Sequence, residues 1–163
     1  MEILREEGYL PTIDDDGDIK LKVQGLTYYV ICDSDDDVYL RVWLPSFWSI
    51  ENNEEFAKAH FVANKVNREY KVAKVTINKN NDNTHAQCEM FISPDDPQLK
   101  RILLRLFNLL SSVRSDFAEG MRADEVWLIE AKDAASLEKL RQLAQTRIES
   151  KLDETISYVP DQY

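Results

Sequence analysis

Residues 19–44 read IKLKVQGLTYYVICDSDDDVYLRVWL, and this stretch decides the fold. Over residues 19–23 apolar side chains alternate with polar ones, which predicts a strand with one buried face. Residues 26–32 are apolar on both faces and rich in aromatic and β-branched side chains, which predicts a strand covered on both sides. Alternation returns over residues 38–44, and Pro45 is expected to end this strand because it cannot donate to the ladder. The stretch therefore predicts a three-strand antiparallel meander.

A helix and a second hairpin are predicted after the meander. Asn52 stands three residues before Glu55, an arrangement typical of a capping box at a helix start. Apolar residues then recur at steps of three and four along residues 56–70, as on a helix with one buried side. Residues 73–92 alternate again around an asparagine-rich turn, which predicts two further strands.

A long helix and a C-terminal appendage complete the predicted chain. Asp96 before Pro97 is expected to cap this helix, and Gly120 is expected to end it. The apolar face of the helix is wide enough to predict a contact with the first helix or with a second subunit. We therefore predict an α+β domain over residues 1–122, in which helices pack on one face of an antiparallel sheet made of the meander plus the hairpin. Residues 123–163 predict a strand–helix appendage.

The chain is strongly acidic, and its charge is unevenly distributed. The net charge is −10 over 163 residues, with fourteen acidic and five basic residues among residues 1–60 and sixteen and fifteen in the remainder. Such a charge opposes nonspecific binding to nucleic acid or to anionic lipid. No apolar run approaches the ~20 residues of a membrane span, and the first residues lack the layout of a signal peptide. We expect a cytoplasmic protein without a nucleic-acid or membrane partner.

No metal site is predicted from the acidic and cysteine residues. The run Asp14-Asp15-Asp16-Gly17-Asp18 resembles a calcium loop in composition, but its glycine and following residues stand at the wrong positions. We interpret it, like the aspartates of residues 33–37, as a solvated turn, and expect the two turns to form one negative rim if they lie at the same edge of the sheet. Cys32 and Cys88 lack CxxC spacing and are predicted to be free, buried thiols.

No catalytic or cofactor site is predicted either. The sequence contains no GxSxG, HExxH, P-loop or GxGxxG motif. His60 and His85 stand without sequence neighbours at the spacing of a triad or a metal pair. A hydrolase built around His60 would require a carboxylate within about 3 Å of its ring, in a concave pocket. We expect no enzyme and no cofactor.

The second face of the sheet holds the candidate binding residues. If helices cover one face, the other presents large aromatic and basic side chains that are unusual in contact with water. Such residues dominate binding hot spots, because they bury much area and keep a polar group. The candidates on this face are Tyr29, Ile31, Tyr39, Arg41, Trp43, Lys74 and Phe91. The alternative is that the chain's own C-terminal helix or a dimer mate covers them.

Two asparagines on the predicted first helix are further candidates. Asn64 and Asn67 lie beside its apolar stripe, where asparagine disfavours a helix because its amide competes for main-chain groups. In the structural interpretation, their amides bond to a neighbouring strand or loop and fix the connection into residues 71–78. In the functional interpretation, they bond to the main chain of a bound peptide.

Several segments resemble the YbjN-like family, described as candidate regulators of bacterial sensory transduction. The resemblance covers roughly residues 1–121 and is most specific where Asn64, Asn67 and Tyr70 precede Ala73-Lys74-Val75. The other matching segments are Gly8-Tyr9, Asp16-Gly17-Asp18-Ile19, Tyr28-Tyr29-Val30 and Val38-Tyr39-Leu40-Arg41. The resemblance implies a fold similar to that of type III secretion chaperones, which commonly dimerise and bind other polypeptides. It brings no catalytic residues.

The predicted function is noncatalytic binding of another polypeptide by a chaperone-like or regulatory protein of the bacterial cytoplasm. The aromatic and arginine-bearing sheet face would bind the partner, and we expect a homodimer to which the appendage contributes contacts. The alternative is a structural protein that uses the sheet face and the C-terminal helix only for self-association. RNA binding through sheet aromatics is a further alternative, but the glycine-and-aromatic signature of RNA-recognition modules is missing.

Overall fold

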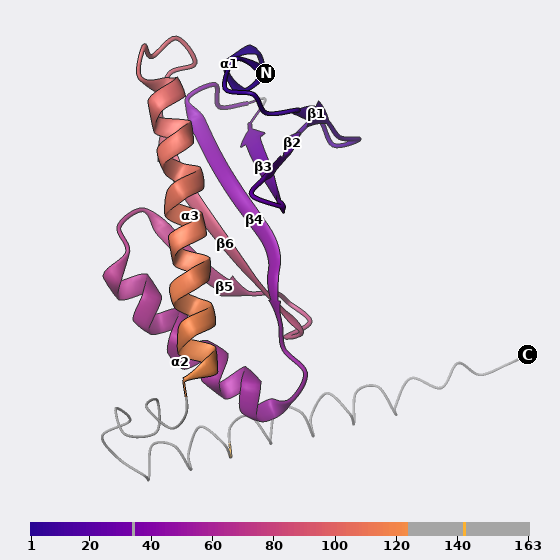
Figure 1. Ribbon diagram of the computed structural model, residues 1–163, viewed down its shortest axis with the longest axis vertical. Coiled ribbons are helices and arrows are strands. Elements are labelled where there is room, and N and C mark those ends of the chain that lie inside the picture. Colours follow the sequence, from indigo (N-terminus) through magenta and orange to yellow (C-terminus); the bar gives the residue numbers. More distant parts are fainter. Residues whose placement is uncertain (34, 124–141, 143–163) are drawn as a thin grey trace, which may run out of the picture.

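The computed structural model describes residues 1–33, 35–123 and 142. This part of the chain confirms the predicted fold class: it is α+β, with a six-stranded antiparallel sheet and three helices packed against it (Figure 1). The elements in chain order are α1 (Glu2–Glu6), β1 (Thr12–Ile13), β2 (Ile19–Val23), β3 (Leu26–Cys32), β4 (Tyr39–Ser49), α2 (Asn53–Glu69), β5 (Ala73–Ile77), β6 (Asn83–Phe91) and α3 (Leu99–Arg122).

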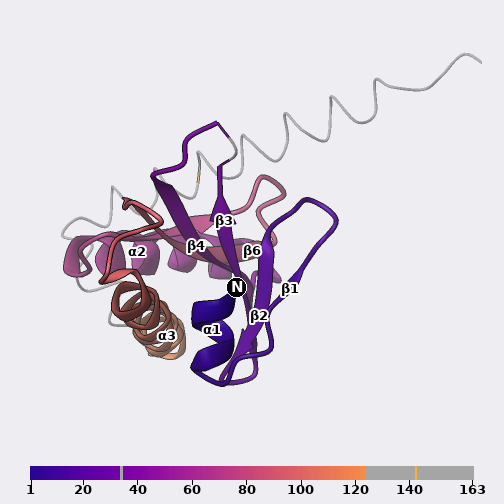
Figure 2. The same cartoon turned by 90° about the horizontal axis from the view of Figure 1, so that it is seen from above.

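The meander and the second hairpin share one sheet. Its strand order is β1-β2-β3-β4-β6-β5, so the long strands β4 and β6 join the two halves. Figure 2, seen from above, shows α1, α2 and α3 gathered on one side of the sheet. Helices therefore cover one face of the sheet, as predicted. None of the three described helices covers the other face.

The core lies between the sheet and the helices. Alternate residues of β4 point into it, with Leu40, Val42 and Leu44 at most 6% exposed. From the helices, α2 buries Val62 and Val66, and α3 buries a row of residues that begins at Leu103. The period of two on the strands thus meets the period of three to four on the helices, which is the packing that the sequence pattern predicts.

The start of α2 confirms the predicted cap. Asn52 Oδ1 accepts a hydrogen bond from the Glu55 N–H at 2.9 Å, and Glu55 Oε2 accepts from the Glu51 N–H at 2.9 Å. The first bond satisfies a main-chain donor that the first helical turn leaves free, and the second ties the Glu55 side chain to the residue before the cap.

Gly120 does not end α3, contrary to prediction, because the helix continues to Arg122. A Cβ atom at this position would lie 2.7 Å from Cγ1 of Val62 on α2. Glycine is therefore required for the close approach of the two helices and not for a turn. The predicted contact between the two helices is confirmed at this point.

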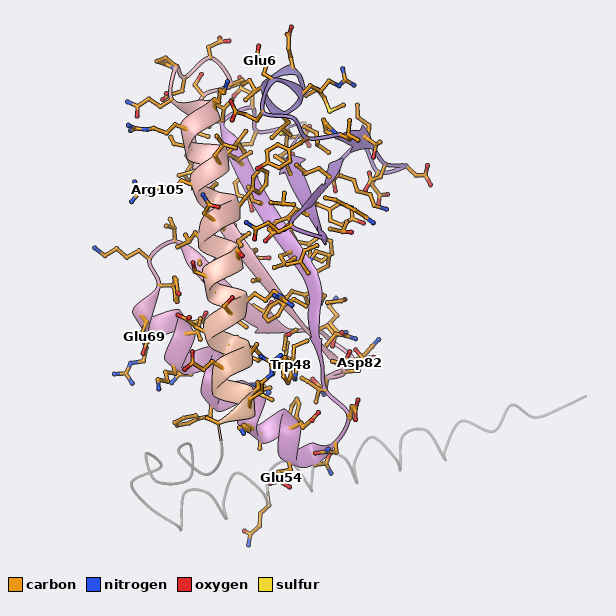
Figure 3. All side chains as sticks on the ribbon, in the orientation of Figure 1. Glu6, Trp48, Glu54, Glu69, Asp82 and Arg105 are labelled. Atoms are coloured by element: carbon orange, nitrogen blue, oxygen red, sulfur yellow. The ribbon has the colours of Figure 1, made fainter. Side chains whose placement is uncertain are left out.

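Pro45 does not end its strand either, since β4 runs on to Ser49. The pairing with β6 shifts between Leu44↔Ala86 and Trp48↔Thr84, so three residues of β4 lie opposite one of β6. A proline is tolerated in such a bulge because no ladder hydrogen bond is needed from its nitrogen. Beyond the bulge, the Trp48 ring packs against Phe117 at 6.2 Å, and Figure 3 shows this tryptophan near the lower part of α3.

The start of α3 also differs from the prediction. The helix begins at Leu99 with Gln98 as its N-cap, and the Gln98 side chain makes no capping hydrogen bond. Asp96 Oδ1 instead accepts from the Gln98 N–H at 2.7 Å, two residues along the chain. The aspartate therefore closes a turn ahead of the helix, a local bond that this residue type favours as readily as a cap.

The prediction that both cysteines are buried is correct for Cys88 and wrong for Cys32. Cys88 on β6 is buried, and burial raises the pKa of its thiol to about 12. Cys32 is exposed because it is the last residue of β3, where the strand leaves the sheet. On the second face of β3, Tyr29 and Ile31 are only half-buried. The described helices therefore do not cover β3 on both sides.

Apart from residue 142, the predicted strand at residues 126–130 and helix at residues 134–152 lie outside the described residues. Within the described ranges, no helix combines the length and the apolar character needed to cross a membrane.

Candidate functional site

The seven sheet candidates lie on one face, opposite the helices. The strand register aligns Tyr29 with Trp43, and Arg41 with both Ile31 and Glu89. It also places Tyr39 opposite Phe91, and Lys74 opposite Gln87. Residues directly opposite each other in a sheet share a face. We call this side the aromatic face and define it by Lys20, Lys22, Thr27, Tyr29, Ile31, Tyr39, Arg41, Trp43, Lys74, Thr76, His85, Gln87, Glu89 and Phe91.

Trp43 is at the centre of a row of rings. Its ring centroid lies 5.5 Å from that of Tyr29 and 5.5 Å from that of His85. The Arg41 guanidinium carbon lies 5.3 Å from the Trp43 ring. Stacking of this kind holds the large side chains in fixed positions, so the face offers a preformed surface.

A second pair of rings lies where β4 begins and β6 ends. Tyr39 and Phe91 meet edge to face with centroids 6.1 Å apart. Phe91 is 75% exposed, which is unusual for a phenylalanine held in a strand. A large apolar side chain in this position is the kind of anchor that a partner can bury.

A polar network centred on Glu89 links the rings. Oε1 of Glu89 accepts from the Tyr39 hydroxyl at 3.0 Å and from Gln87 Nε2 at 3.1 Å, and Oε2 pairs with the Lys74 ammonium. Gln87 Oε1 in turn accepts from Nη2 of Arg41 at 2.6 Å. The hydrogen bond from Lys74, and then that from Tyr39, lower the pKa of the Glu89 carboxyl. Burial, followed by the bond to Glu89, raises the pKa of the Tyr39 hydroxyl.

The network leaves Arg41 incompletely satisfied. Nε of Arg41 is buried and has no hydrogen-bond partner in the described part of the chain. No carboxylate there lies within salt-bridge distance of its guanidinium. A buried donor without an acceptor costs free energy, so the Arg41 side chain is held at this position at the expense of one hydrogen bond.

Seven members of the aromatic face did not figure among the sequence candidates, and three of them, His85, Gln87 and Glu89, lie on β6. Gln87 and Glu89 are recognisable only through the β4–β6 register, which brings them beside residues more than 40 positions away. His85 Nδ1 accepts from the Ser46 N–H at 3.2 Å, and burial, followed by the charge of Arg41, lowers the pKa of this imidazole. The only sequence signal for them was the alternation of β6, which fixes the face but not the neighbours.

The two acidic turns lie at the same end of the sheet. In an antiparallel meander, the start of β2 and the end of β3 are neighbours, and Ile19 pairs with Val30 there. The turn of residues 14–18 and the described residues 33 and 35–37 therefore lie at the same end of the sheet, as the predicted rim requires. Burial, followed by the charges of Asp14 and Asp16, raises the pKa of Asp18. Asp14 Oδ1 accepts from the N–H groups of Asp16 and Asp18, which forms a local turn.

The two asparagine candidates lie on α2, away from the aromatic face. Asn67 bonds twice to the main chain of Val75 on β5, at 3.1 and 2.7 Å. This matches the structural interpretation, in which the amide fixes the connection from α2 into the next strand. Asn64 is exposed on the same helix. The structure thus separates these two residues from the other candidates.

Over residues 1–33 and 35–123, no three histidine, cysteine or acidic side chains gather as a group that could hold a metal ion. The aromatic face itself carries groups that stack, form hydrogen bonds and pair charges.

Comparison with known proteins bears on the fold. No family model matches the sequence, and no curated protein matches it. An uncharacterized protein from Methanothermobacter thermautotrophicus is 17% identical, with a TM-score of 0.48 over 72% of this chain and 93% of that one. YbjN from E. coli, described as a candidate transcription regulator, is 9% identical, with a TM-score of 0.54 over 72% of this chain and 85% of that one. The predicted likeness to YbjN is thus confirmed at the level of the fold.

Proposed function

We propose that this protein binds another polypeptide through its aromatic face, as a noncatalytic, chaperone-like or regulatory protein of the cytoplasm. The observation that carries the proposal is the composition of that face: Trp43, Tyr29 and Phe91 lie with Arg41 on the side of the sheet opposite the helices. Half-exposed aromatic rings cost free energy in water, and a partner that buries them recovers it at about 25 cal/mol per Å² of apolar surface.

Charge supports a polypeptide over a nucleic acid. The aromatic face is basic in places, but the acidic turns at its end and the net charge of −10 would repel a phosphate backbone. A polypeptide can carry carboxylates toward Arg41 and basic residues toward the aspartates. YbjN, whose fold is similar, is described as a candidate transcription regulator, and regulation by protein contact fits the same surface.

The test is affinity capture from native cytosol with the wild type and a Trp43→Ala, Tyr39→Ala variant. Arg105→Ala is the matched control, because this side chain is exposed on α3 and points away from the sheet (Figure 3). We expect a protein that the wild type and the control retain and the double variant loses, and that binds again when both proteins are purified.

Two other outcomes would contradict the proposal. Capture that nuclease treatment abolishes would indicate a nucleic-acid partner. A doubled mass by light scattering, reduced to that of a monomer by the double variant, would assign the aromatic face to a homodimer and favour the structural, self-associating alternative.

A further inference from the structure

The two edges of the sheet differ in how their main chain is occupied. At the β5 edge, Asn67 Nδ2 donates to the Val75 carbonyl at 3.1 Å, and Asn67 Oδ1 accepts from the Val75 N–H at 2.7 Å. The outward main-chain groups at the centre of β5 are therefore used within the chain. This edge is closed to an added strand, as sheet edges in native proteins commonly are.

The opposite edge is open over the second half of β2. Strand β1 pairs only with its start, through Thr12↔Lys20 and Ile13↔Ile19. In the described part of the chain, no hydrogen bond reaches the edge beyond Lys20. The free stretch ends at a two-residue turn of Gln24 and Gly25, whose φ values of 50° and 84° fit a type I′ hairpin.

The turn determines which groups face outward. The residues that flank a two-residue hairpin, Val23 and Leu26, form a hydrogen-bonded pair, so the next pair, Lys22↔Thr27, is a non-hydrogen-bonded one. The N–H and C=O of Lys22 therefore point away from β3, toward the open edge. They offer one donor and one acceptor at the position where β1 would have continued.

A cavity of about 420 Å³ lies beside this edge. Its lining is apolar at Tyr9, Leu10 and Leu21, and Lys20 and Lys22 also line it. Leu10 is 89% exposed, an extreme value for a leucine.

From these observations we propose that the open edge of β2 binds an extended, alternating acidic and apolar segment of a partner polypeptide as an added strand. One residue of the segment pairs with the N–H and C=O of Lys22, and its acidic side chain lies beside the Lys22 ammonium. The residues on either side project to the opposite face, and an apolar side chain among them is placed to contact Leu10, which lines the cavity at this edge. This site is distinct from the rings of the aromatic face and goes beyond the function proposed above.

The lysines select the occupant. If two copies of this chain paired edge to edge about a twofold axis, lysines of one β2 would face lysines of the other, and like charges opposite each other destabilise a sheet. A strand with carboxylates at alternate positions meets the same lysines with the opposite charge. The edge therefore opposes self-association and favours an acidic partner.

The test uses the full chain and capped heptapeptides as probes, with binding followed by NMR shifts of main-chain amides. The peptides alternate valine with glutamate, alternate valine with lysine, or repeat the glutamate peptide with N-methyl groups on its edge-facing amides. We expect the glutamate peptide to shift the Lys22 amide, the lysine peptide to bind at least tenfold more weakly, and N-methylation to weaken binding about tenfold.

Charge reversal separates recognition from damage to the fold. Lys22→Glu is expected to lose the glutamate peptide and gain the lysine peptide, whereas the control Lys65→Glu, at an exposed position on α2, changes neither. Equal binding of the glutamate and lysine peptides, or of the methylated and parent peptides, would overturn the proposal, as would failure of the glutamate peptide to bind.

Trp43→Ala distinguishes this site from the aromatic face. We expect the variant to keep the glutamate peptide, since Trp43 does not line the cavity. Loss of the peptide in this variant would overturn the edge site and assign the binding to the aromatic face. Retention, together with a failed capture experiment, would leave the edge site intact and remove the function proposed for the aromatic face.

Discussion

The two faces of β4 are built from neighbouring residues but differ in side-chain type and in burial. Leu40, Val42 and Leu44 point to the helices and are at most 6% exposed. Arg41 and Trp43 lie between them, point the other way and stay half-buried. One face is made of aliphatic side chains that fill space, and the other of rings and hydrogen-bonding groups that can meet a partner. The difference shows that the alternation of one strand places buried core side chains and half-buried aromatic and basic side chains within a few residues of each other.

The largest expected effect comes from placing a charge on the helix-covered side. Val66→Asp puts an unpaired carboxylate at a position that is 3% exposed, where α2 packs on the sheet. Losing the buried side chain costs about 1.5–3 kcal/mol, and burying the charge costs more. We expect no cooperative thermal melt by circular dichroism. Lys65→Asp, one residue earlier and exposed, is the control and is expected to melt near the wild type; a wild-type melt of Val66→Asp would refute this packing.

A direct comparison of adjacent residues sharpens the contrast between the faces. Val42→Ala should lower the free energy of unfolding by about 2 kcal/mol, because a fully buried side chain leaves a cavity. Trp43→Ala removes a much larger side chain but should cost only about 1 kcal/mol, the value of its ring contacts. Urea denaturation measures both. If Trp43→Ala costs as much as or more than Val42→Ala, the aromatic face is packed in the native protein and not free to bind.

Gly120→Ala tests the contact between the two long helices. The added methyl group would meet Val62 Cγ1 at 2.7 Å, so we expect a net loss of about 1–2 kcal/mol, even though alanine favours a helix over glycine by about 1 kcal/mol. Denaturation of the Val62→Ala, Gly120→Ala double variant provides the check. Because Val62→Ala removes the clash, the losses of stability in the two single variants should sum to more than the loss in the double variant. If the two losses simply add, the effect of Gly120→Ala does not come from the contact with Val62.

The smallest effect concerns pH and the aromatic face. The hydrogen bond from Lys74 lowers the pKa of Glu89 below its ordinary value of 4.5. A carboxyl whose pKa is lower in the folded state stabilises the protein above its unfolded pKa, and this contribution is lost as the pH falls through the folded pKa. The stability difference between the wild type and Glu89→Gln should therefore be present at pH 7 and shrink below about pH 4. Thermal melts across this range measure it, and a difference that stays constant with pH would contradict the assignment.

The predictable part of the fold is the part that local patterns specify. Alternation at residues 19–23, 38–44 and 73–92 predicted the strands, and the Asn52–Glu55 spacing predicted the cap of α2, because each depends on residues a few positions apart. The same alternation placed Tyr29, Trp43 and Lys74 on one face before any register was known. These features follow from the fixed periods of strands and helices.

Features that depend on contacts between residues far apart in the chain could not be predicted from the sequence. Gly120 resembles a helix terminator until Val62 is placed against it, and Pro45 resembles a strand end until β6 supplies a bulge. The neighbours of Glu89 and the open edge at Lys22 likewise follow from register and strand order. By itself the sequence determined which residues are apolar, where they recur and so which face each occupies. Only the tertiary structure decided which faces, edges and side chains meet, because those contacts join segments whose separation in the chain carries no local signal.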